Sequence, residues 1–296
     1  MISALLEKNF EILKPYLNKK GLVEISINRP GEIWLETEND GWIFKKDKRL
    51  TKIKLTNLAQ NLATESGQDF DEETPMLSLA LPKWGYRLQV ISGSAVDSGF
   101  ALSIRAGVAK ELPLSSWFIP EEIQQLKTLV KSRKTMLVSG GTGSGKTTLL
   151  NSLLREIDFD DRIVTLEDSK ELVVKQPNHV RLLKSKTGTD IANLSYKDFI
   201  NAIMRFRPDR ILLGEIDIEN TPNFLRLINT GHDGSFATIH ANSIDGAISA
   251  LVMNCTLSGM KGADEKIQQY ALAHIDAIIQ VKRNIDDGKR TFSAEI

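Results

Sequence analysis

The sequence Val138-Ser139-Gly140-Gly141-Thr142-Gly143-Ser144-Gly145-Lys146-Thr147-Thr148 carries the pattern G-x-x-x-x-G-K-[ST] near the middle of the chain. Glycines at these places let successive backbone N–H groups turn inward around phosphate oxygens, which a Cβ would obstruct. The lysine adds a positive charge for the β- and γ-phosphates, and the threonine hydroxyl that follows it can ligate Mg²⁺. The pattern therefore predicts a phosphate-binding loop with these ligand-facing residues: Gly141, Thr142, Gly143, Ser144, Gly145, Lys146, Thr147 and Thr148.

The flanking residues supply the context that such a loop requires. Thr135–Val138 is a short apolar stretch typical of a buried strand, and Thr148–Leu154 has apolar residues at helical spacing. The positive end of that helix dipole would face the phosphates. A glycine-rich turn without a ligand is the alternative interpretation, and the strand–loop–helix order favours nucleotide phosphates over it.

Length and composition describe an ordinary globular protein of about two domains. The chain has 296 residues, of which 41% are hydrophobic and 26% are charged, and its formal net charge is zero. A neutral chain offers no global electrostatic case for binding nucleic acid or an anionic membrane surface.

The expected location is the cytoplasm. The single Cys255 excludes an intrachain disulfide and fits a reducing compartment, and such a residue is more often a buried apolar side chain than a reactive thiol. The N-terminus lacks the basic and apolar regions of a signal peptide, and no apolar run approaches the ~20 residues that span a bilayer. A cytoplasmic protein of this kind can still dock on a membrane complex.

Residues 1–106 mix strand and helix patterns without regular alternation, which predicts a small α+β domain. Apolar residues at helical spacing begin at Ile2 and reach Leu13, with Pro15 closing that helix, and a second helical stripe is ended by Gly67. Strands are predicted at 23–27, 33–36, 42–45, 76–80, 86–91 and 100–105, with a hairpin turn at 39–41.

Residues 107–113 contain a glycine and a proline and show little periodicity, so they form the predicted linker. Shortly before the linker, Arg87 and Arg105 each lie on a predicted strand. Taken alone, either arginine is more often an exposed strand charge than a functional residue.

Residues 114–296 alternate strand and helix patterns, which predicts an α/β domain with a largely parallel sheet. Besides the strand before the phosphate loop, strands are predicted at 162–166, 210–214 and 235–239. Helices are predicted at 120–132 and 195–205, from Thr221-Pro222 as N-cap and first residue, from the N-cap Ser243 to 257, and at 264–274. A closing hairpin joins 277–281 to 290–294 around Asp287-Gly288.

Polar residues follow three of these strands directly. Glu167 and Asp168 follow the strand at 162–166, Glu215 follows the next, and His240 follows the strand at 235–239. Because the carboxyl ends of parallel strands meet at one edge of the sheet, we expect these side chains to converge near the phosphate loop. A carboxylate there can hold Mg²⁺ or orient an attacking water, whereas a single strand-end acid would be better explained by solvation.

Four boxes in this order resemble the hexameric traffic ATPases of bacterial type IV secretion, which are relatives of type II secretion and type IV pilus ATPases. They are the phosphate loop, the acidic box Thr165–Leu172, the Walker-B-like segment Arg207–Glu215 and the histidine box Thr230–Asn242. Three N-terminal segments, Glu24–Trp34, Gly85–Val90 and Ser103–Arg105, look like the type IV secretion branch. The resemblance implies a RecA-like P-loop ATPase domain preceded by the smaller N-terminal domain, with ATP between the two.

The resemblance also implies roles for single residues. Lys146 would hold the β/γ-phosphates, Thr147 and Glu215 the Mg²⁺, and Glu167 would match the acidic-box residue proposed as general base. His240 would sense the γ-phosphate. Two further pairs complete the implied set: Arg87 and Arg105 would reach phosphate from the N-terminal domain, and Arg205 and Arg207 would act at a subunit interface.

One departure from the family pattern concerns the residues after the Walker-B strand. The family continues with Gly-Glu-x-Arg and a second Glu three residues later, whereas this chain has Gly214-Glu215-Ile216-Asp217 and then Glu219 and Asn220. An acid at Asp217 would reverse an interaction that the arginine makes at an interface. Either a partner has changed with it, or turnover is slow.

The resulting hypothesis is a homohexameric Mg²⁺-dependent ATPase, peripheral at the bacterial inner membrane, that powers assembly or substrate transfer with partner proteins of the secretion or conjugation apparatus. The alternative is an ATP-binding assembly module with little turnover, which the departure at Asp217 would favour. A nucleic-acid motor on the same core is weaker, because neither the neutral charge nor the 6% aromatic content offers a basic stripe with interleaved aromatics.

Overall fold

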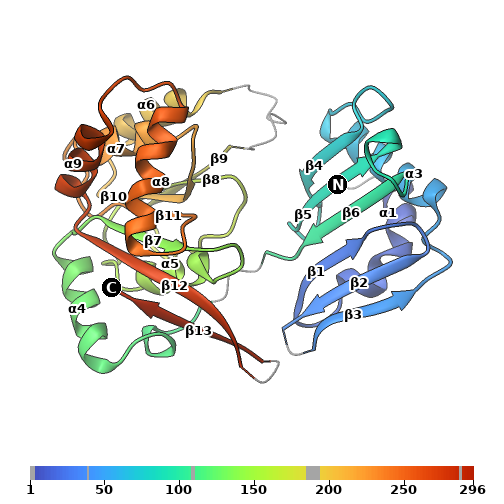
Figure 1. Cartoon of the computed structure of the whole chain (residues 1–296), viewed down its shortest axis with the longest axis horizontal. Helices are drawn as coiled ribbons and strands as arrows, with labels where there is room; N and C mark the ends of the chain where they lie inside the picture. Colours follow the sequence, from blue (N-terminus) through green and yellow to red (C-terminus); the bar gives the residue numbers. More distant parts are fainter. Residues whose placement is uncertain (1–3, 39, 108–110, 185–193, 287–288) are drawn as a thin grey trace. The chain divides into compact units, whose positions relative to one another are not determined.

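The computed structural model describes residues 4–38, 40–107, 111–184, 194–286 and 289–296 (Figure 1). Its contacts divide the chain into an N-terminal and a C-terminal compact unit. Parts of four predicted features lie outside the described residues: the start of the first helix, residue 39 of the first hairpin, residues 108–110 of the linker, and Asp287-Gly288 of the last turn.

The N-terminal unit contains an antiparallel sheet of six strands in the order β3-β2-β1-β6-β5-β4. All six strands that the sequence predicts are present, and β2 and β3 form the predicted hairpin. Their bounds are β1 (Leu22–Ile27), β2 (Glu32–Thr37), β3 (Gly41–Lys46), β4 (Met76–Ala80), β5 (Arg87–Ser92) and β6 (Phe100–Arg105).

Helices cover one face of this sheet. They are α1 (Ala4–Asn9), the 3-10 turn η1 (Phe10–Ile12), α2 (Lys14–Leu17) and α3 (Lys52–Ser66), and a second 3-10 turn, η2, spans Gly93–Ala95. The prediction that Pro15 closes the first helix is wrong, because it lies in the first turn of α2, where a missing N–H leaves no helical bond unmade. Gly67 ends α3 with φ +69°, as predicted.

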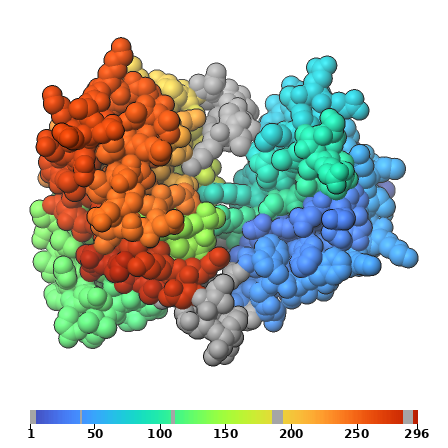
Figure 2. Space-filling model, viewed as in Figure 1, coloured from blue at the N-terminus to red at the C-terminus, as the bar shows by residue number. Residues whose placement is uncertain are grey.

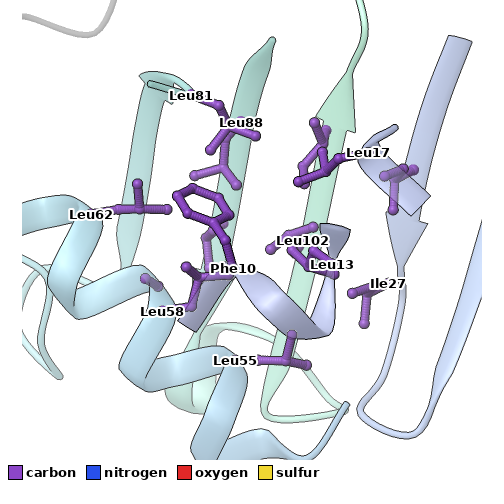
Figure 3. Packing of buried hydrophobic residues seen from close by; sticks show 14 of the residues in the cluster. Phe10, Leu13, Leu17, Ile27, Leu55, Leu58, Leu62, Leu81, Leu88 and Leu102 are labelled. Atoms are coloured by element: carbon purple, nitrogen blue, oxygen red, sulfur yellow. The ribbon is translucent and has the colours of Figure 1, made fainter. Parts of the chain in front are cut away.

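The core of the N-terminal unit forms between these helices and the sheet. Figure 3 shows side chains from the helices facing side chains from the strands and from the turn after β4. The helix side chains include Phe10, Leu13, Leu17, Leu55, Leu58 and Leu62, and the opposing ones include Ile27, Leu81, Leu88 and Leu102. Successive side chains of a strand point to opposite faces, so the residues between these core positions belong to the other face of the sheet.

The C-terminal unit contains a sheet of seven strands in the order β13-β12-β7-β11-β10-β8-β9. Every neighbouring pair is parallel except the hairpin of β12 and β13. The bounds are β7 (Met136–Gly140), β8 (Ile163–Glu167), β9 (His179–Leu183), β10 (Arg210–Ile216), β11 (Phe236–Ile239), β12 (Ala277–Asp286) and β13 (Lys289–Glu295). The sequence did not predict β9, a short edge strand whose side chains are half-buried or exposed.

Helices pack on both faces of the C-terminal sheet and bury two apolar clusters. One cluster includes α4 (Pro120–Lys131), α5 (Lys146–Leu154) and the turn η3 (Leu114–Ser116); the other includes α6 (Tyr196–Phe206), α7 (Thr221–Ile228), α8 (Ile244–Leu257) and α9 (Asp264–His274). The N-cap of α7 is Asn220, so the prediction of Thr221 as N-cap is off by one residue. Ser243 caps α8 as predicted.

The predicted fold class is confirmed, since an antiparallel α+β unit precedes an α/β unit with a mostly parallel sheet. Cys255 is buried, as its composition-based interpretation suggested. None of the helices in the described part of the chain is both long and apolar enough to cross a membrane.

Candidate functional site

The phosphate loop joins β7 to α5, and its glycines are required by its backbone path. Gly143 and Gly145 have φ of +68° and +97°, in the left-handed region that side chains disfavour. A Cβ at Gly140 would lie 2.7 Å from the carbonyl oxygen of Val281 and closer still to Ser144 Oγ. The three glycines therefore let the loop turn tightly against β12 and begin α5 with open N–H groups.

Lys146, the first residue of α5, is held by the loop itself. Its Nζ donates to the carbonyl oxygens of Gly140 at 2.9 Å and Gly141 at 3.0 Å, and the residue is only 8% exposed. The ammonium is thus held against the carbonyl oxygens at the start of the loop.

His240 connects Lys146 to Glu215. The Nζ of Lys146 lies 3.2 Å from His240 Nδ1, and His240 Nε2 lies 2.7 Å from Glu215 Oε1. An ammonium can only donate, so Nδ1 accepts, and the neutral ring carries its proton on Nε2 and donates it to Glu215. The strand order β7-β11-β10 explains the contact, because the carboxyl ends of these three strands are neighbours.

Glu167, at the end of the next strand β8, has both carboxylate oxygens occupied. Oε1 accepts from Thr165 Oγ1 at 3.1 Å and from Nη2 and Nε of Arg181 at 2.9 and 3.3 Å. Oε2 accepts from the backbone N–H groups of Glu171 and Leu172 at 2.8 and 2.7 Å. The carboxylate therefore anchors the loop that follows β8 and pairs with an arginine of β9.

The same loop is fastened to α5 by Asn151. Its Nδ2 donates to the carbonyl oxygen of Glu171, and its Oδ1 accepts from the backbone N–H of Val173. Asp168, on this loop, accepts from the N–H of Ser169 at 2.9 Å. The acidic box is thus a built turn with one acid, Glu167, at its centre.

Two residues of this site, Asn151 and Arg181, were not predicted from the sequence. Arg181 lies on the strand that was not predicted. Asn151 was part of the predicted helix but gave no signal of its own, because a buried polar residue cannot be told from an exposed one without the packing.

The departure at Asp217 has a local explanation. Asp217 Oδ1 accepts from the N–H of Glu219, and Asn220 Oδ1 accepts from the N–H of Asp217. Asn220 Nδ2 donates to the carbonyl oxygen of Glu215. An acid at 217 and an amide at 220 therefore close the turn between β10 and α7, a role that an arginine at 217 could not fill.

Of the four arginines of the resemblance, Arg87 and Arg105 belong to the N-terminal unit, and Arg205 and Arg207 to the C-terminal unit. Arg87 and Arg105 stand directly opposite each other on β5 and β6, on the face of the N-terminal sheet that the core residues leave. Like charges directly opposite on a sheet are unfavourable unless other charges offset them. Arg205 is exposed in the last turn of α6. Arg207, the exposed C-cap residue of the same helix, has a left-handed backbone conformation.

The donor set at the loop fits Mg²⁺. Thr147 in the first turn of α5 supplies a hydroxyl, and Glu215 supplies carboxylate oxygens, which are the hard donors that this ion prefers. Within the described ranges no cluster of three or more His, Cys, Asp or Glu side chains forms a metal cage.

Comparison with known proteins relates the whole chain to one family. The family described as type II/IV secretion system protein matches residues 7–280. The type IV secretion system protein VirB11 of Bartonella henselae is 31% identical over an aligned length of 321 residues, which covers 95% of this chain and 90% of that protein.

Two solved structures are similar over nearly the full length. The VirB11 ATPase from the Brucella suis type IV secretion system, in complex with sulphate, is 27% identical with a TM-score of 0.53 and covers 99% of this chain and 94% of that one. The pilus retraction motor PilT with bound ADP is 22% identical with a TM-score of 0.66, covering 97% and 82%. At that lower identity the likeness concerns the fold alone.

Proposed function

Because the chain belongs to the type II/IV secretion system protein family, we propose that it is a Mg²⁺-dependent ATPase that powers assembly or substrate transfer in a type IV secretion or conjugation machine. The observation that carries the proposal is the chain of contacts from Lys146 through His240 to Glu215 at the phosphate loop. It provides a cation for the phosphates and a carboxylate for water or metal on neighbouring strands. Hydrolysis of a phosphoanhydride requires both.

Of the two strand-end acids, Glu215 is the better placed to orient the attacking water. Its side chain is 21% exposed, whereas that of Glu167 is 1% exposed and accepts hydrogen bonds on both oxygens. A water can reach the Glu215 carboxylate from solvent, whereas at Glu167 it would have to displace a hydrogen-bond donor from one of the carboxylate oxygens. We therefore assign the role of base to Glu215, and we assign to Glu167 the positioning of the acidic-box turn.

His240 suits a sensor of the γ-phosphate because it touches both partners. A phosphate that draws the ammonium of Lys146 away from Nδ1 removes the donor at one side of the ring, and the ring in turn orients Glu215 through Nε2. Mg²⁺, when bound through Thr147 and Glu215, would supply further neutralisation of phosphate charge. Occupation of the loop and orientation of the acid are thereby linked.

Arg87 and Arg105 are proposed to contact the nucleotide from the N-terminal domain. Their direct pairing across β5 and β6 concentrates two guanidinium groups on one face, which favours an anion with several oxygens. The relative PilT has been solved with bound ADP. We propose ATP as the nucleotide of this chain.

The assembly that we propose is a homohexameric ring that lies peripherally at the bacterial inner membrane and docks on proteins of the secretion apparatus. The support is the family, together with the exposure of Arg205 and Arg207 beside the Walker-B strand. The mass of the full chain in solution with ATP and Mg²⁺ tests the ring, and persistent monomers would contradict it.

The test of the enzymatic proposal uses Lys146→Ala and Glu215→Gln. We expect both variants to keep the fold, by circular dichroism, and to lose at least about a hundredfold in steady-state phosphate release, the size expected when one charge-stabilising group is removed. The matched control is Glu219→Gln, which removes an exposed acid of the turn after β10. Full activity in both variants would exclude the proposed site.

A second candidate function is an assembly module that binds ATP with little turnover. The observation that favours it is Asp217, which stands where the family has an arginine and closes a local turn. An acid at this place cannot make the interface contact that the resemblance implies for the arginine. Binding of a non-hydrolysable ATP analogue with sub-micromolar affinity, together with no phosphate release above buffer, would establish this module in place of the ATPase.

A further inference from the structure

A second cation lies over the phosphate loop on the strand next to it. A Cβ built on Gly143 would lie 3.3 Å from Nη1 of Arg283, so the guanidinium occupies the space where a side chain of residue 143 would begin. Gly143 is the loop residue with φ +68°, three residues before Lys146. The loop therefore passes directly beneath an arginine of its own chain.

The pairing of β12 with β7 explains this placement. The two strands run parallel, with Gln280 beside Ser139 and Val281 beside Gly140. At Gly140 the chain leaves β7 to form the loop, whereas β12 continues to Asp286 and pairs with β13, a strand pair seen in red on the surface of the C-terminal unit in Figure 2. Because side chains alternate, Arg283 shares the face of Val281, which is buried in the cluster that contains residues of α5, the helix that follows the loop.

The charges around Arg283 favour the binding of an anion. Among the side chains that the structure describes, which leave out those of residues 285–292, no carboxylate pairs with its guanidinium, whereas the neighbouring Lys282 pairs with Glu295 at 2.7 Å. Lys146, the other cation of the loop, is held by loop carbonyls. An exposed guanidinium without a described counterion, above a loop whose N–H groups open toward phosphate, is a ready donor to phosphate oxygens.

We propose that Arg283 donates to phosphate oxygens of the nucleotide held by the loop and so acts as a positioning residue supplied by β12. The inference rests on the proposed function and extends it by a cation that the phosphate-loop pattern does not include. Its side chain is exposed and long, so it can close over a bound phosphate chain without movement of the strand. It would act together with Lys146, each from one side of Gly143.

The experiment measures affinity for a fluorescent non-hydrolysable ATP analogue and for ADP, in the full chain with Mg²⁺, for the unchanged protein, Arg283→Gln, Arg283→Lys and Lys146→Ala. We expect Arg283→Gln to weaken analogue binding by about tenfold, the effect of one hydrogen bond between charged partners. Arg283→Lys should recover part of the loss, because it keeps the charge and loses the fork. The dependence of affinity on salt should become shallower in Arg283→Gln, a change that a purely structural role would not produce.

The matched control is Lys282→Gln, which removes the adjacent cation on the same strand but on its opposite face. Unchanged affinity and salt dependence in Arg283→Gln, within twofold of this control, would overturn the proposal. If the unchanged protein binds no nucleotide, or if Lys146→Ala binds as well as it does, the proposed function itself fails. The two failures are therefore distinguishable.

Discussion

At the scale of single residues, Glu167 and Glu215 show how two acids at similar strand ends acquire different roles. Glu167 is buried, pairs with Arg181 and holds two backbone N–H groups of the acidic box. Glu215 is more exposed and is oriented by the neutral ring of His240. Burial with a full set of donors stabilises a carboxylate in place, whereas access to water suits one that acts on a water molecule.

The role of Arg181 can be tested by removing its charge. Arg181→Gln leaves Glu167 buried with only Thr165 and two backbone donors, so we expect a loss of about 3 kcal/mol in the free energy of unfolding, measured with urea on the full chain. The double variant Glu167→Gln/Arg181→Gln should lose less than the sum of the single variants, because they share one interaction. The control is Arg226→Gln, an exposed arginine of α7.

Glu167→Gln then separates the two roles of that acid. We expect it to reduce phosphate release far less than Glu215→Gln does. The glutamine keeps one side-chain oxygen that can accept hydrogen bonds from the acidic-box turn, so the turn stays anchored. A loss as large as that of Glu215→Gln, without a loss of stability, would return the role of base to Glu167.

The sequence placed Lys146, Glu215 and His240 near one another because each follows a strong strand pattern that ends at the same edge of the sheet, and their side chains are in contact. Their roles stay predictions. The partners of Glu167 could not be found in this way. Arg181 lies on an edge strand whose half-exposed side chains have no clear alternation, and the ion pair depends on how that strand pairs with β8.

At the scale of elements, Asp47 ties the helices of the N-terminal unit to its sheet. This residue follows β3, and its carboxylate accepts from Nε and Nη2 of Arg49 and, at 2.7 Å, from the hydroxyl of Tyr16 in α2. The hydrogen bond from Arg49, with that of Tyr16, holds the pKa of Asp47 well below its usual value of 3.8, although burial opposes this. Burial and the same carboxylate raise the pKa of Tyr16.

This clamp makes the N-terminal unit sensitive to acid. Because the folded pKa of Asp47 lies below the unfolded value, its stabilisation is complete above about pH 4 and is lost as the pH falls through the folded pKa. Asp47→Asn should lower the free energy of unfolding by about 2 kcal/mol at pH 7, compared with the unchanged protein. The difference between the two proteins should become smaller below about pH 4. Urea unfolding followed by tryptophan fluorescence measures this, since Trp34, Trp42 and Trp84 lie in the N-terminal unit.

The control for the clamp is Glu72→Gln, an exposed acid of the same unit. A cost for Asp47→Asn that stays constant between pH 7 and pH 3 would show that the carboxylate is not the group responsible.

Helices and strands were predicted well when their sequence pattern was strong, as for β4, β6 and α9, and poorly at their ends. The end of β12 was predicted at residue 281, and the part beyond it carries Arg283 over the loop.

At the scale of the whole molecule, the chain combines an antiparallel unit carrying paired arginines with a parallel unit carrying the phosphate loop. Under the proposed function, a nucleotide contacted by residues of both units would turn the loss of a phosphate into a domain movement, because contact with the γ-phosphate differs between the two states. Composition and alternation were enough to predict the fold class, an antiparallel α+β part followed by an α/β part. Their joint action depends on contacts that no sequence pattern specifies, and it remains part of the proposal.

The most direct measurement is steady-state phosphate release by the unchanged full chain supplied with ATP, with Mg²⁺ and with the metal removed by EDTA. The account predicts turnover that requires Mg²⁺ and that falls at least about a hundredfold in Lys146→Ala and in Glu215→Gln. Nucleotide binding without any Mg²⁺-dependent release would contradict it.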